Sequence, residues 1–287
     1  MPLNLSPALF RAGLPVRADQ LLVGRGLAAS RSQAQRLIAG GLRWRLGPGG
    51  AWRTVGKNGD EVPEAAEVEL ADAAEARYVS RGGLKLEGVL RTAGVDPAGR
   101  ACLDVGQSTG GFTDCLLQHG AAGVLGLDVG HGQLHPRLRD DRRVLCIEGC
   151  NARELDPGRL AELQADAIES IADGRRRSPA SAPFSSEFSL VVGDLSFISL
   201  TLVLPALVPL LSAGGDLLVL VKPQFELQPG QVGKGGIVRD AALFAVVEAR
   251  LRAACAEGGL QVVGWHDSPI AGGDGNREFF IHARRAA

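Results

Sequence analysis

Lysine is rare in this chain, and two of its lysines are candidates for proton transfer. Only four of the 31 basic residues are lysines, and the others are arginines. A lysine that is buried or flanked by another charge can give up its proton, whereas arginine in practice never does. Lys85 follows the glycine-containing stretch 80–84, and Lys222 ends the apolar run 216–221. An accident of composition explains most single lysines, but the surroundings of Lys222 favour acid–base chemistry.

Two acidic residues are predicted to join these lysines. Asp194 ends the apolar run 190–194, and Glu278 opens an apolar segment near the end of the chain. If such runs are parallel strands, their carboxyl ends meet at the ligand-binding edge of a sheet. Burying a charge there is costly unless the charge is paired or used, so a purely structural Asp194–Lys222 ion pair is the alternative. Together with Lys85 the set could hold and activate a weak nucleophile such as a ribose 2′-hydroxyl.

A glycine-rich segment predicts a cofactor-binding turn. The apolar run 101–106 leads into it, the glycines let backbone approach a ligand, and the following helix start favours negative charge. Asp128, about twenty residues after Asp104, suits a ribose diol. A carboxylate at Asp104 would repel a pyrophosphate but suits the cationic groups of S-adenosylmethionine, although a dinucleotide or a plain structural turn also fits the glycines. The predicted cofactor-binding residues are Asp104, Gly106, Ser108, Thr109, Gly110, Gly111, Phe112, Asp128 and Asn151.

The elements that must position these residues follow a repeating order from residue 81 onward. Short apolar runs without polar alternation indicate strands buried on both faces, and alternation with helices predicts a doubly wound, Rossmann-like parallel α/β sheet. The predicted strands cover 101–106, 123–129, 144–147, 190–194 and 216–221, with a closing pair over 259–265 and 278–282. The predicted helices cover 111–118, 134–140, 200–211 and 241–255, the last capped by Asp240 and ended by Gly258 and Gly259.

The first part of the chain predicts a small α+β domain. Residues 1–57 carry nine basic residues and one acid, Asp19, whereas residues 60–75 carry seven acids and no base. Asp19 is predicted to cap a first helix, and Ser30 with Gln33 predicts a capping box for a second. Strands over 42–46, 52–55 and 67–70 are predicted to follow. A basic surface on such a fold favours nucleic-acid binding over a merely solvated charged face.

This order of two helices and a small sheet resembles the S4-type RNA-binding domain. The resemblance spans residues 17–75 and implies contacts to RNA phosphates, although the turn 44–50 replaces the Val-Asn-Gly turn usual in such domains. It rests on the motifs Arg17-Ala18-Asp19-x-Leu21-Leu22, Gly26-Leu27-Ala28-x-Ser30-Arg31 and Ala34-x-x-Leu37-Ile38-x-x-Gly41. The predicted RNA-binding residues are Arg17, Arg31, Gln35, Arg36 and, on a later glycine-rich loop, Lys234. The predicted domains are 1–75 and 81–287, joined by a linker over 76–80.

Essentially the whole chain resembles the TlyA family, whose members were labelled haemolysins but resemble FtsJ/RrmJ-like ribose methyltransferases with an S4-type head. The motifs that carry this resemblance span 78–86, 104–114, 128–134, 194–200, 221–226 and 231–236. The resemblance implies S-adenosylmethionine-dependent 2′-O-methylation of cytidine in ribosomal RNA, with Lys85, Asp194, Lys222 and Glu278 as a catalytic tetrad and Lys222 nearest the hydroxyl. Two departures are Gln107, where a small residue is usual, and an insertion rich in Ser, Pro and Arg over 172–188.

Several other classes of protein fit the sequence less well. Five cysteines without a Cys-x-x-Cys pair argue against a disulfide framework or a zinc ribbon, and the five histidines show no metal-ligand spacing. No signal peptide opens the chain, and the longest apolar stretch, 199–211, is too short to span a bilayer. We therefore expect a cytoplasmic protein that acts on ribosomal RNA or ribosomal subunits, with no metal and no membrane. The alternatives are a non-catalytic RNA-binding protein, a membrane-active haemolysin and a Rossmann dehydrogenase.

Overall fold

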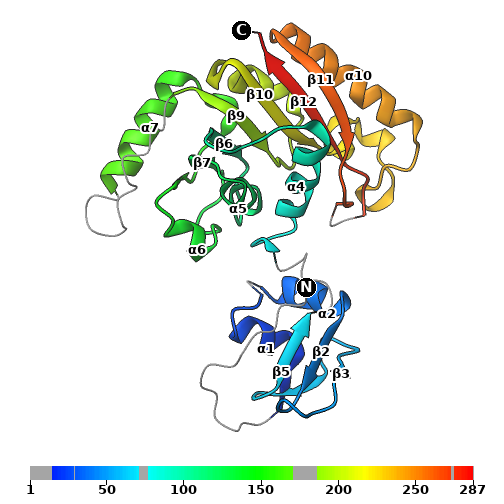
Figure 1. The fold of residues 1–287 in the computed structure, drawn as a ribbon. Coiled ribbons are helices and arrows are strands. Elements are labelled where there is room, and N and C mark those ends of the chain that lie inside the picture. The colour runs from blue at the N-terminus through cyan, green and yellow to red at the C-terminus, as the bar shows by residue number, and fades with distance from the viewer. Residues whose placement is uncertain (1–14, 29, 71–76, 171–185, 273–274, 287) are drawn as a thin grey trace. The chain divides into compact units, whose positions relative to one another are not determined.

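The computed structural model describes residues 15–28, 30–70, 77–170, 186–272 and 275–286. Within them the chain divides into two compact units, with the division between Arg81 and Gly82, and Figure 1 shows each unit as a ribbon. The predicted linker ends one residue before this division, and its residue 76 lies outside the described residues. Residues 172–185 of the predicted insertion also lie outside them.

The first unit packs two helices with short strands around its own apolar core. The helices are α1 (Ala18–Gly24) and α2 (Arg31–Ala39), and their apolar faces meet inward-pointing residues of the strands, as in Leu22, Leu37 and Val68. Helix α2 begins as predicted, because the Ser30 hydroxyl accepts a hydrogen bond from the Gln33 backbone N–H at 3.2 Å. The strands are β1 (Pro15–Arg17), β2 (Leu42–Arg45), β3 (Arg53–Thr54), β4 (Glu61–Pro63) and β5 (Glu67–Leu70), which form a pair β1–β4 and a sheet of order β3-β2-β5.

The prediction that Asp19 caps α1 is wrong. The helix begins at Ala18, so Asp19 already lies inside its first turn. Its fully buried carboxylate instead forms ion pairs with Arg17 at 2.9 Å and with Arg31 at 3.1 Å. The hydrogen bond from Arg17, helped by the one from Arg31, outweighs burial and holds the pKa of Asp19 well below its usual range. Asp19 therefore orders two of the predicted RNA-binding arginines at the surface.

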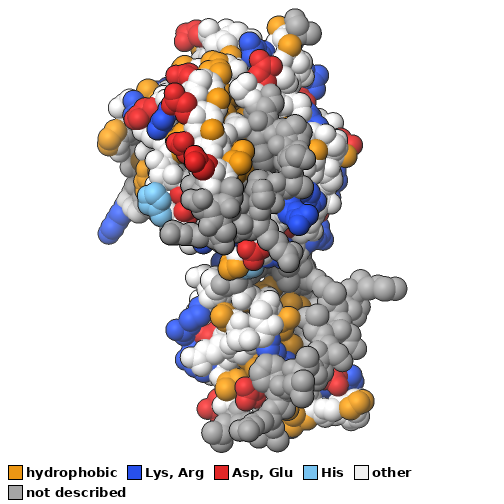
Figure 2. Space-filling model, turned by 90° about the vertical axis from the view of Figure 1, so that its left-hand side faces the viewer, with side chains coloured by type: hydrophobic (Ala, Val, Ile, Leu, Met, Phe, Trp, Pro, Cys, Tyr) orange, Lys and Arg blue, Asp and Glu red, His pale blue; other side chains and the backbone are white. Residues whose placement is uncertain are grey.

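The acidic run that follows the basic segment folds back onto it. The antiparallel register of β2 and β5 places Glu69 opposite Arg43 and Glu67 opposite Arg45, and both pairs close to 2.7 Å. Part of the positive excess seen in the sequence is therefore neutralised inside the unit. On the face seen in Figure 2, acidic side chains lie near basic ones.

The second unit is built on a seven-stranded sheet of order β11-β12-β10-β9-β6-β7-β8. Its strands are β6 (Ala101–Val105), β7 (Gly123–Leu127), β8 (Val144–Ile147), β9 (Phe188–Gly193), β10 (Leu211–Val221), β11 (Leu260–Asp267) and β12 (Phe279–Arg285). The strands from β6 to β10 run parallel, and β12 is antiparallel to both of its neighbours. The parallel sheet and the closing strand pair predicted from the sequence are confirmed. Strand order reverses between β6 and β9, which makes their carboxyl ends the topological switch point where ligands bind.

Helices cover both faces of this sheet. Helices α4 (Gly82–Ala93) and α5 (Gly111–Gln118) lie side by side against one face (Figure 1). Helices α7 (Pro157–Ser170), α8 (Leu204–Leu207) and α10 (Ala242–Glu257) join the core of the other face, through residues such as Leu160, Leu207 and Leu251. The sequence predicted α5 and α10 but neither α4 nor α7. Gly258 ends α10, as predicted, and Gly259 adopts a φ of +77°.

Two predicted helices are shorter in the structure. Only α6 (Pro136–Arg139) forms within 134–140. The segment 200–211 breaks into the 3₁₀ turn η3 (Leu200–Leu202), α8 and the 3₁₀ turn η4 (Val208–Leu210), and residue 211 already belongs to β10. Pro205 and Pro209 cause the break, because proline lacks an amide hydrogen and restricts the residue before it.

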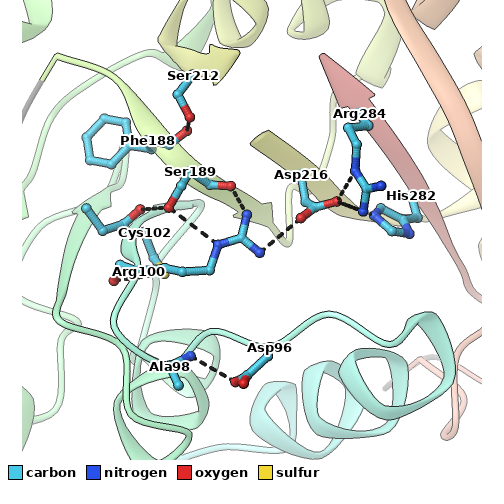
Figure 3. Close-up of polar contacts among 11 residues, drawn as sticks. Asp96, Ala98, Arg100, Cys102, Phe188, Ser189, Ser212, Asp216, His282 and Arg284 are labelled. Atoms are coloured by element: carbon cyan, nitrogen blue, oxygen red, sulfur yellow. Dashed lines mark hydrogen bonds and ion pairs between the residues drawn. The ribbon is translucent and has the colours of Figure 1, made fainter. Parts of the chain in front are cut away.

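A buried ion cluster ties the strands together around Asp216 (Figure 3). Its carboxylate is paired with Arg100 at 2.9 Å, His282 at 2.8 Å and Arg284 at 2.8 Å, and Arg100 also donates to the backbone carbonyl of Ser189. Burial disfavours the charged form of Asp216, but the hydrogen bonds from His282, Arg284 and Arg100 outweigh it and lower its pKa. The cluster links β9, β10, β12 and the segment entering β6.

Candidate active site

A pocket of about 440 Å³ opens at the carboxyl ends of β6, β7 and β9, the switch point of the sheet. The turn after β6, the end of β7, the segment after β8 and the loop after β9 supply its walls. Among its lining residues are five that the sequence singled out, namely Gly106, Ser108, Asp128, Asn151 and Asp194. The predicted cofactor turn and a predicted catalytic acid therefore border one cavity.

The turn after β6 depends on glycine and on Asp128. Gly106 has a φ of +81°, and a Cβ there would come within 2.8 Å of the Asp194 carbonyl oxygen, so only glycine fits. The backbone N–H of Ser108 donates to Asp128 at 2.6 Å, and that of Gly130 donates to its other oxygen at 2.7 Å. Each carboxylate oxygen can accept two hydrogen bonds, so Asp128 shapes the loop and still offers acceptors to a ligand in the pocket.

Asp104 lies directly beneath this turn and is fully buried. Its Oδ2 accepts a hydrogen bond from the Thr113 hydroxyl at 2.6 Å, whereas its Oδ1 has no hydrogen-bond partner. Burial raises the pKa of Asp104 to about 7, opposed by Thr113 and reinforced by the charges of Asp194 and Asp128. A buried carboxylate oxygen without a donor is a place where a cationic ligand group would be stabilised.

Gln107, the departure from the family pattern, is accommodated by its neighbours. Its amide donates to the Thr113 hydroxyl at 2.9 Å. The Gln107 side chain also fills the space over Gly126 of β7. A Cβ on residue 126 would lie only 2.0 Å from Gln107 Cδ. A large residue at 107 is therefore compatible with the turn because residue 126 has no side chain.

The other predicted cofactor residues shape the turn and do not line the pocket. Gly110 has a φ of +92° and leaves room for Leu138. A Cβ on residue 110 would lie only 2.3 Å from Leu138 Cδ1. Gly111 begins α5, and Phe112 is buried with its ring 6.1 Å from that of Phe280. The Thr109 carbonyl accepts a hydrogen bond from the backbone of His135. These residues support the pocket wall without facing the cavity.

The four predicted catalytic residues form two close ion pairs. Lys85 of α4 lies 2.5 Å from Glu278, which precedes β12. Lys222, directly after β10, lies 2.6 Å from Asp194, directly after β9. Burial raises the pKa of Glu278, and the charge of Lys85 opposes this rise. The charge of Asp194 raises the same pKa and that of Lys222 lowers it. The two pairs therefore share one electrostatic environment. The structural ion pair considered from the sequence is thus present, but it borders the switch-point pocket.

The loop after β9 holds two residues to which the sequence analysis assigned no role. The Ser196 hydroxyl accepts a hydrogen bond from the Lys222 ammonium at 2.7 Å. Phe197 is 90% exposed although it is aromatic, has a φ of +63°, and lines the pocket with its ring 5.1 Å from that of Phe225. A positive φ at a bulky residue costs energy and is concentrated at functional sites. Both residues lie in the motif 194–200, which carries part of the family resemblance, and this motif is the sequence feature that could have pointed to them.

Glu226 anchors this loop from below. Its buried carboxylate accepts hydrogen bonds from the Ser199 hydroxyl at 2.6 Å and from the Leu200 backbone N–H at 2.7 Å. Glu226 ends the short helix α9 (Pro223–Glu226), which directly follows Lys222. The loop after β9 and the turn after β10 are therefore held together at the side away from the pocket.

The predicted RNA-binding residues lie on both units. Arg31 and Gln35 are exposed on α2, Arg36 is half-buried, and Lys234 is exposed in the 3₁₀ turn η6 (Lys234–Gly236). Within the described part of the chain, no helix is long and apolar enough to cross a membrane. The same residues contain no group of three or more His, Cys, Asp or Glu side chains able to hold a metal ion.

A switch-point pocket with an acidic, glycine-rich first turn, bordered by the carboxylate that pairs with Lys222, defines a methyltransferase type of α/β domain. Residues 78–285 match the FtsJ-like methyltransferase family. The chain is 43% identical over 276 residues to the 16S/23S rRNA (cytidine-2′-O)-methyltransferase TlyA of Mycobacterium tuberculosis, covering 93% of this chain and 89% of that protein. It is 35% identical to Hemolysin A of Brachyspira hyodysenteriae, covering 93% and 99% of the two chains.

A solved structure agrees with these matches. A candidate hemolysin from Streptococcus thermophilus superimposes with a TM-score of 0.67 at 37% identity, covering 95% of this chain and 89% of that one. The chain therefore belongs to the FtsJ-like methyltransferase family, in its TlyA branch. The family resemblance predicted from the motifs is confirmed.

Proposed function

We propose that this protein transfers a methyl group from S-adenosylmethionine to the 2′-hydroxyl of a cytidine in ribosomal RNA. The observation that carries the proposal is the ion pair of Lys222 with Asp194 at 2.6 Å, in which Asp194 lines the switch-point pocket. The name of the M. tuberculosis relative supports cytidine in 16S and 23S rRNA as the substrate. A ribose hydroxyl is a poor nucleophile, and a lysine placed against it is the kind of group that this reaction needs.

The residues of the pocket fit S-adenosylmethionine. Asp128 lines the pocket and offers acceptors for a ribose diol. Asp104 is buried behind the pocket wall, and we propose that its Oδ1, which has no hydrogen-bond partner, accepts from the ammonium group of the bound cofactor. Asn151 lines the same cavity, although its side chain also caps the 3₁₀ turn η1 (Ala152–Glu154) by accepting from the Arg153 backbone N–H at 3.2 Å. When bound, S-adenosylmethionine supplies an electrophilic methyl group.

The two lysines and the two acids have different roles at the 2′-hydroxyl. We assign to Lys222 Nζ the role of holding the hydroxyl and taking its proton, with Asp194 fixing the direction of Nζ. Lys85 and Glu278 are each nearly buried and complete the charge balance of the cluster without reaching solvent. Alignment of the attacking oxygen supplies much of the remaining rate enhancement.

Phe197 is proposed as a platform for the base of the target nucleotide. Stacking of a base on an aromatic ring contributes about 1–3 kcal/mol, so we expect Phe197→Ala to lower kcat/KM for RNA by about tenfold or more. The affinity for S-adenosylmethionine should not change. Leu202→Ala is a matched control, because it removes an exposed apolar side chain of the next turn that does not line the pocket. Unchanged kcat/KM in Phe197→Ala would contradict this role.

Cofactor binding should depend on the ionisation of Asp104. Since burial raises its pKa to about 7, Asp104 is mostly neutral at pH 6 and mostly charged at pH 7.5. A charged carboxylate binds an ammonium better, so calorimetry should show affinity for S-adenosylmethionine falling about tenfold from pH 7.5 to pH 6. Asp104→Asn should bind weakly at both pH values. A variant that keeps the wild-type pH dependence would assign the effect to another group.

We further propose that the first unit is an S4-type domain that positions the ribosomal substrate, and that the protein acts in the cytoplasm. The support is the order α1, α2 and a small sheet, with Arg17 and Arg31 ordered by Asp19 and still 45% and 60% exposed. Guanidinium groups held in this way suit RNA phosphates and position the substrate without reading its sequence.

The substrate assignment is tested by nucleoside analysis. Ribosomal RNA from cells lacking the gene would be digested and compared by mass spectrometry with RNA from cells expressing the protein. We expect 2′-O-methylcytidine to appear only with the protein, and separate digestion of each subunit's RNA identifies the subunit. An increase in a base-methylated nucleoside, with 2′-O-methylcytidine unchanged, would overturn the proposal.

A further inference from the structure

Lys222 has a second partner besides Asp194. An ammonium group has three N–H donors. In this structure Nζ lies 2.6 Å from Asp194 as an ion pair and donates a hydrogen bond to the Ser196 hydroxyl at 2.7 Å. The ion pair and the hydrogen bond together hold Nζ in place. We propose that Ser196 is a positioning residue that holds Lys222 so that its Nζ faces the 2′-hydroxyl, a role that rests on the proposed function.

The position of Ser196 is imposed by its loop. On one side, Asp194 directly follows the parallel pairing of β9 with β6 and β10. On the other, Glu226 holds Ser199 and Leu200. With both ends of a short loop fixed, the Ser196 hydroxyl meets Nζ at little entropic cost. Ser196 is itself exposed and lines the pocket, so its replacement removes the contact without opening a cavity in the core.

The charges around Lys222 set the expected direction of the effect. Asp194 contacts Lys222 from the loop after β9, and the charges of Glu278, directly before β12, and of its partner Lys85 on α4 act on the same cluster. The Ser196 hydroxyl accepts from the charged form of the amine, so removing it disfavours that form. The amine of Lys222 should therefore lose its proton at lower pH in Ser196→Ala than in the wild type. Ser196→Thr keeps the hydroxyl and should behave as the wild type does.

The small number of lysines makes this measurable without RNA. A chain with four lysines, labelled with ¹³C only in lysine, gives few enough Cε signals to follow through a pH titration by NMR, and Lys222→Arg identifies the signal of Lys222. We expect the midpoint for Lys222 to move to lower pH in Ser196→Ala and to return in Ser196→Thr. Thr201→Val is the matched control, since that hydroxyl meets Ser199 and not Lys222. Identical Lys222 titrations in the wild type and Ser196→Ala would overturn the proposal.

Activity gives the second arm of the test. With unmethylated ribosomal subunits and labelled S-adenosylmethionine, Ser196→Ala should lower kcat about tenfold and leave KM for the cofactor unchanged, and Ser196→Thr should restore most of the loss. A general loosening of the loop would raise KM as well and would not be rescued by threonine, which would overturn the positioning role. If the wild type transfers no label to either subunit, the proposed function fails, whereas a moved Lys222 titration still establishes that Ser196 holds the amine.

Discussion

Lys222→Arg should fold, bind S-adenosylmethionine and lose methyl transfer. Arginine keeps the positive charge and can still pair with Asp194, but it does not release a proton at any pH at which the enzyme works. A positioned acid–base group contributes about 10²- to 10⁴-fold to rate, so we expect kcat to fall by about that factor. Thermal unfolding and calorimetric binding of S-adenosylmethionine should match the wild type.

The control for this variant is Lys57→Arg. Lys57 is exposed on the first unit, so the same chemical change there should leave kcat as it is. If Lys222→Arg retains wild-type turnover, then Lys222 contributes only its charge and does not accept the proton. Loss of cofactor binding in Lys222→Arg would instead show that the residue shapes the pocket.

Asp216→Asn should cause a large loss of stability. The carboxylate balances the charges of Arg100 and Arg284 and accepts a hydrogen bond from His282 in a cluster that is mostly buried. Removing one charge of a buried pair leaves the others uncompensated, which costs about 3–5 kcal/mol, and the half exposure of Arg284 places the expected loss at about 3 kcal/mol. Denaturant unfolding of the full chain measures it. Asp267→Asn, which breaks an exposed pair with Arg277, should cost less than about 1 kcal/mol.

The same cluster predicts a loss of stability in acid. Hydrogen bonds hold the pKa of Asp216 below its ordinary value of 3.8. A lowered carboxyl pKa contributes stability that is complete above that ordinary value and is lost as pH falls through the folded value. The gap in unfolding free energy between the wild type and Asp216→Asn should therefore narrow below about pH 4. A gap that stays constant to pH 2 would show that the carboxylate is not the source of the stability.

Much of the second unit followed from the sequence because its strands are short, apolar and buried on both faces. That pattern located β6 to β10, and the rule that ligands bind at the carboxyl ends of parallel strands predicted from the sequence alone that Asp194 and Lys222 lie close together. The pairing of Lys85 with Glu278 was not predicted. The family resemblance implied only that both belong to the tetrad, because α4 and β12 are separated by nearly the whole domain and meet only through tertiary packing.

The features that the sequence analysis missed have two origins, contacts between separate segments and local signals that were given too little weight. Asp19 looked like a helix cap because caps are local signals, yet the backbone reaches helical geometry one residue earlier and the carboxylate is buried between two arginines. The helix predicted over 200–211 ignored two prolines whose effect is local and could have been anticipated. The exposed ring of Phe197 and the contact of Ser196 with Lys222 arise from a loop conformation, which composition and periodicity do not determine.

The central claim is that this chain methylates ribosomal RNA through Lys222. The most direct measurement incubates purified wild type and Lys222→Arg with methyl-labelled S-adenosylmethionine and with unmethylated small and large ribosomal subunits, and then counts label in the RNA. The account predicts that the wild type labels at least one subunit and that Lys222→Arg labels neither, although both bind the cofactor. Absence of label with the wild type on both subunits, or equal label with the two proteins, would contradict it.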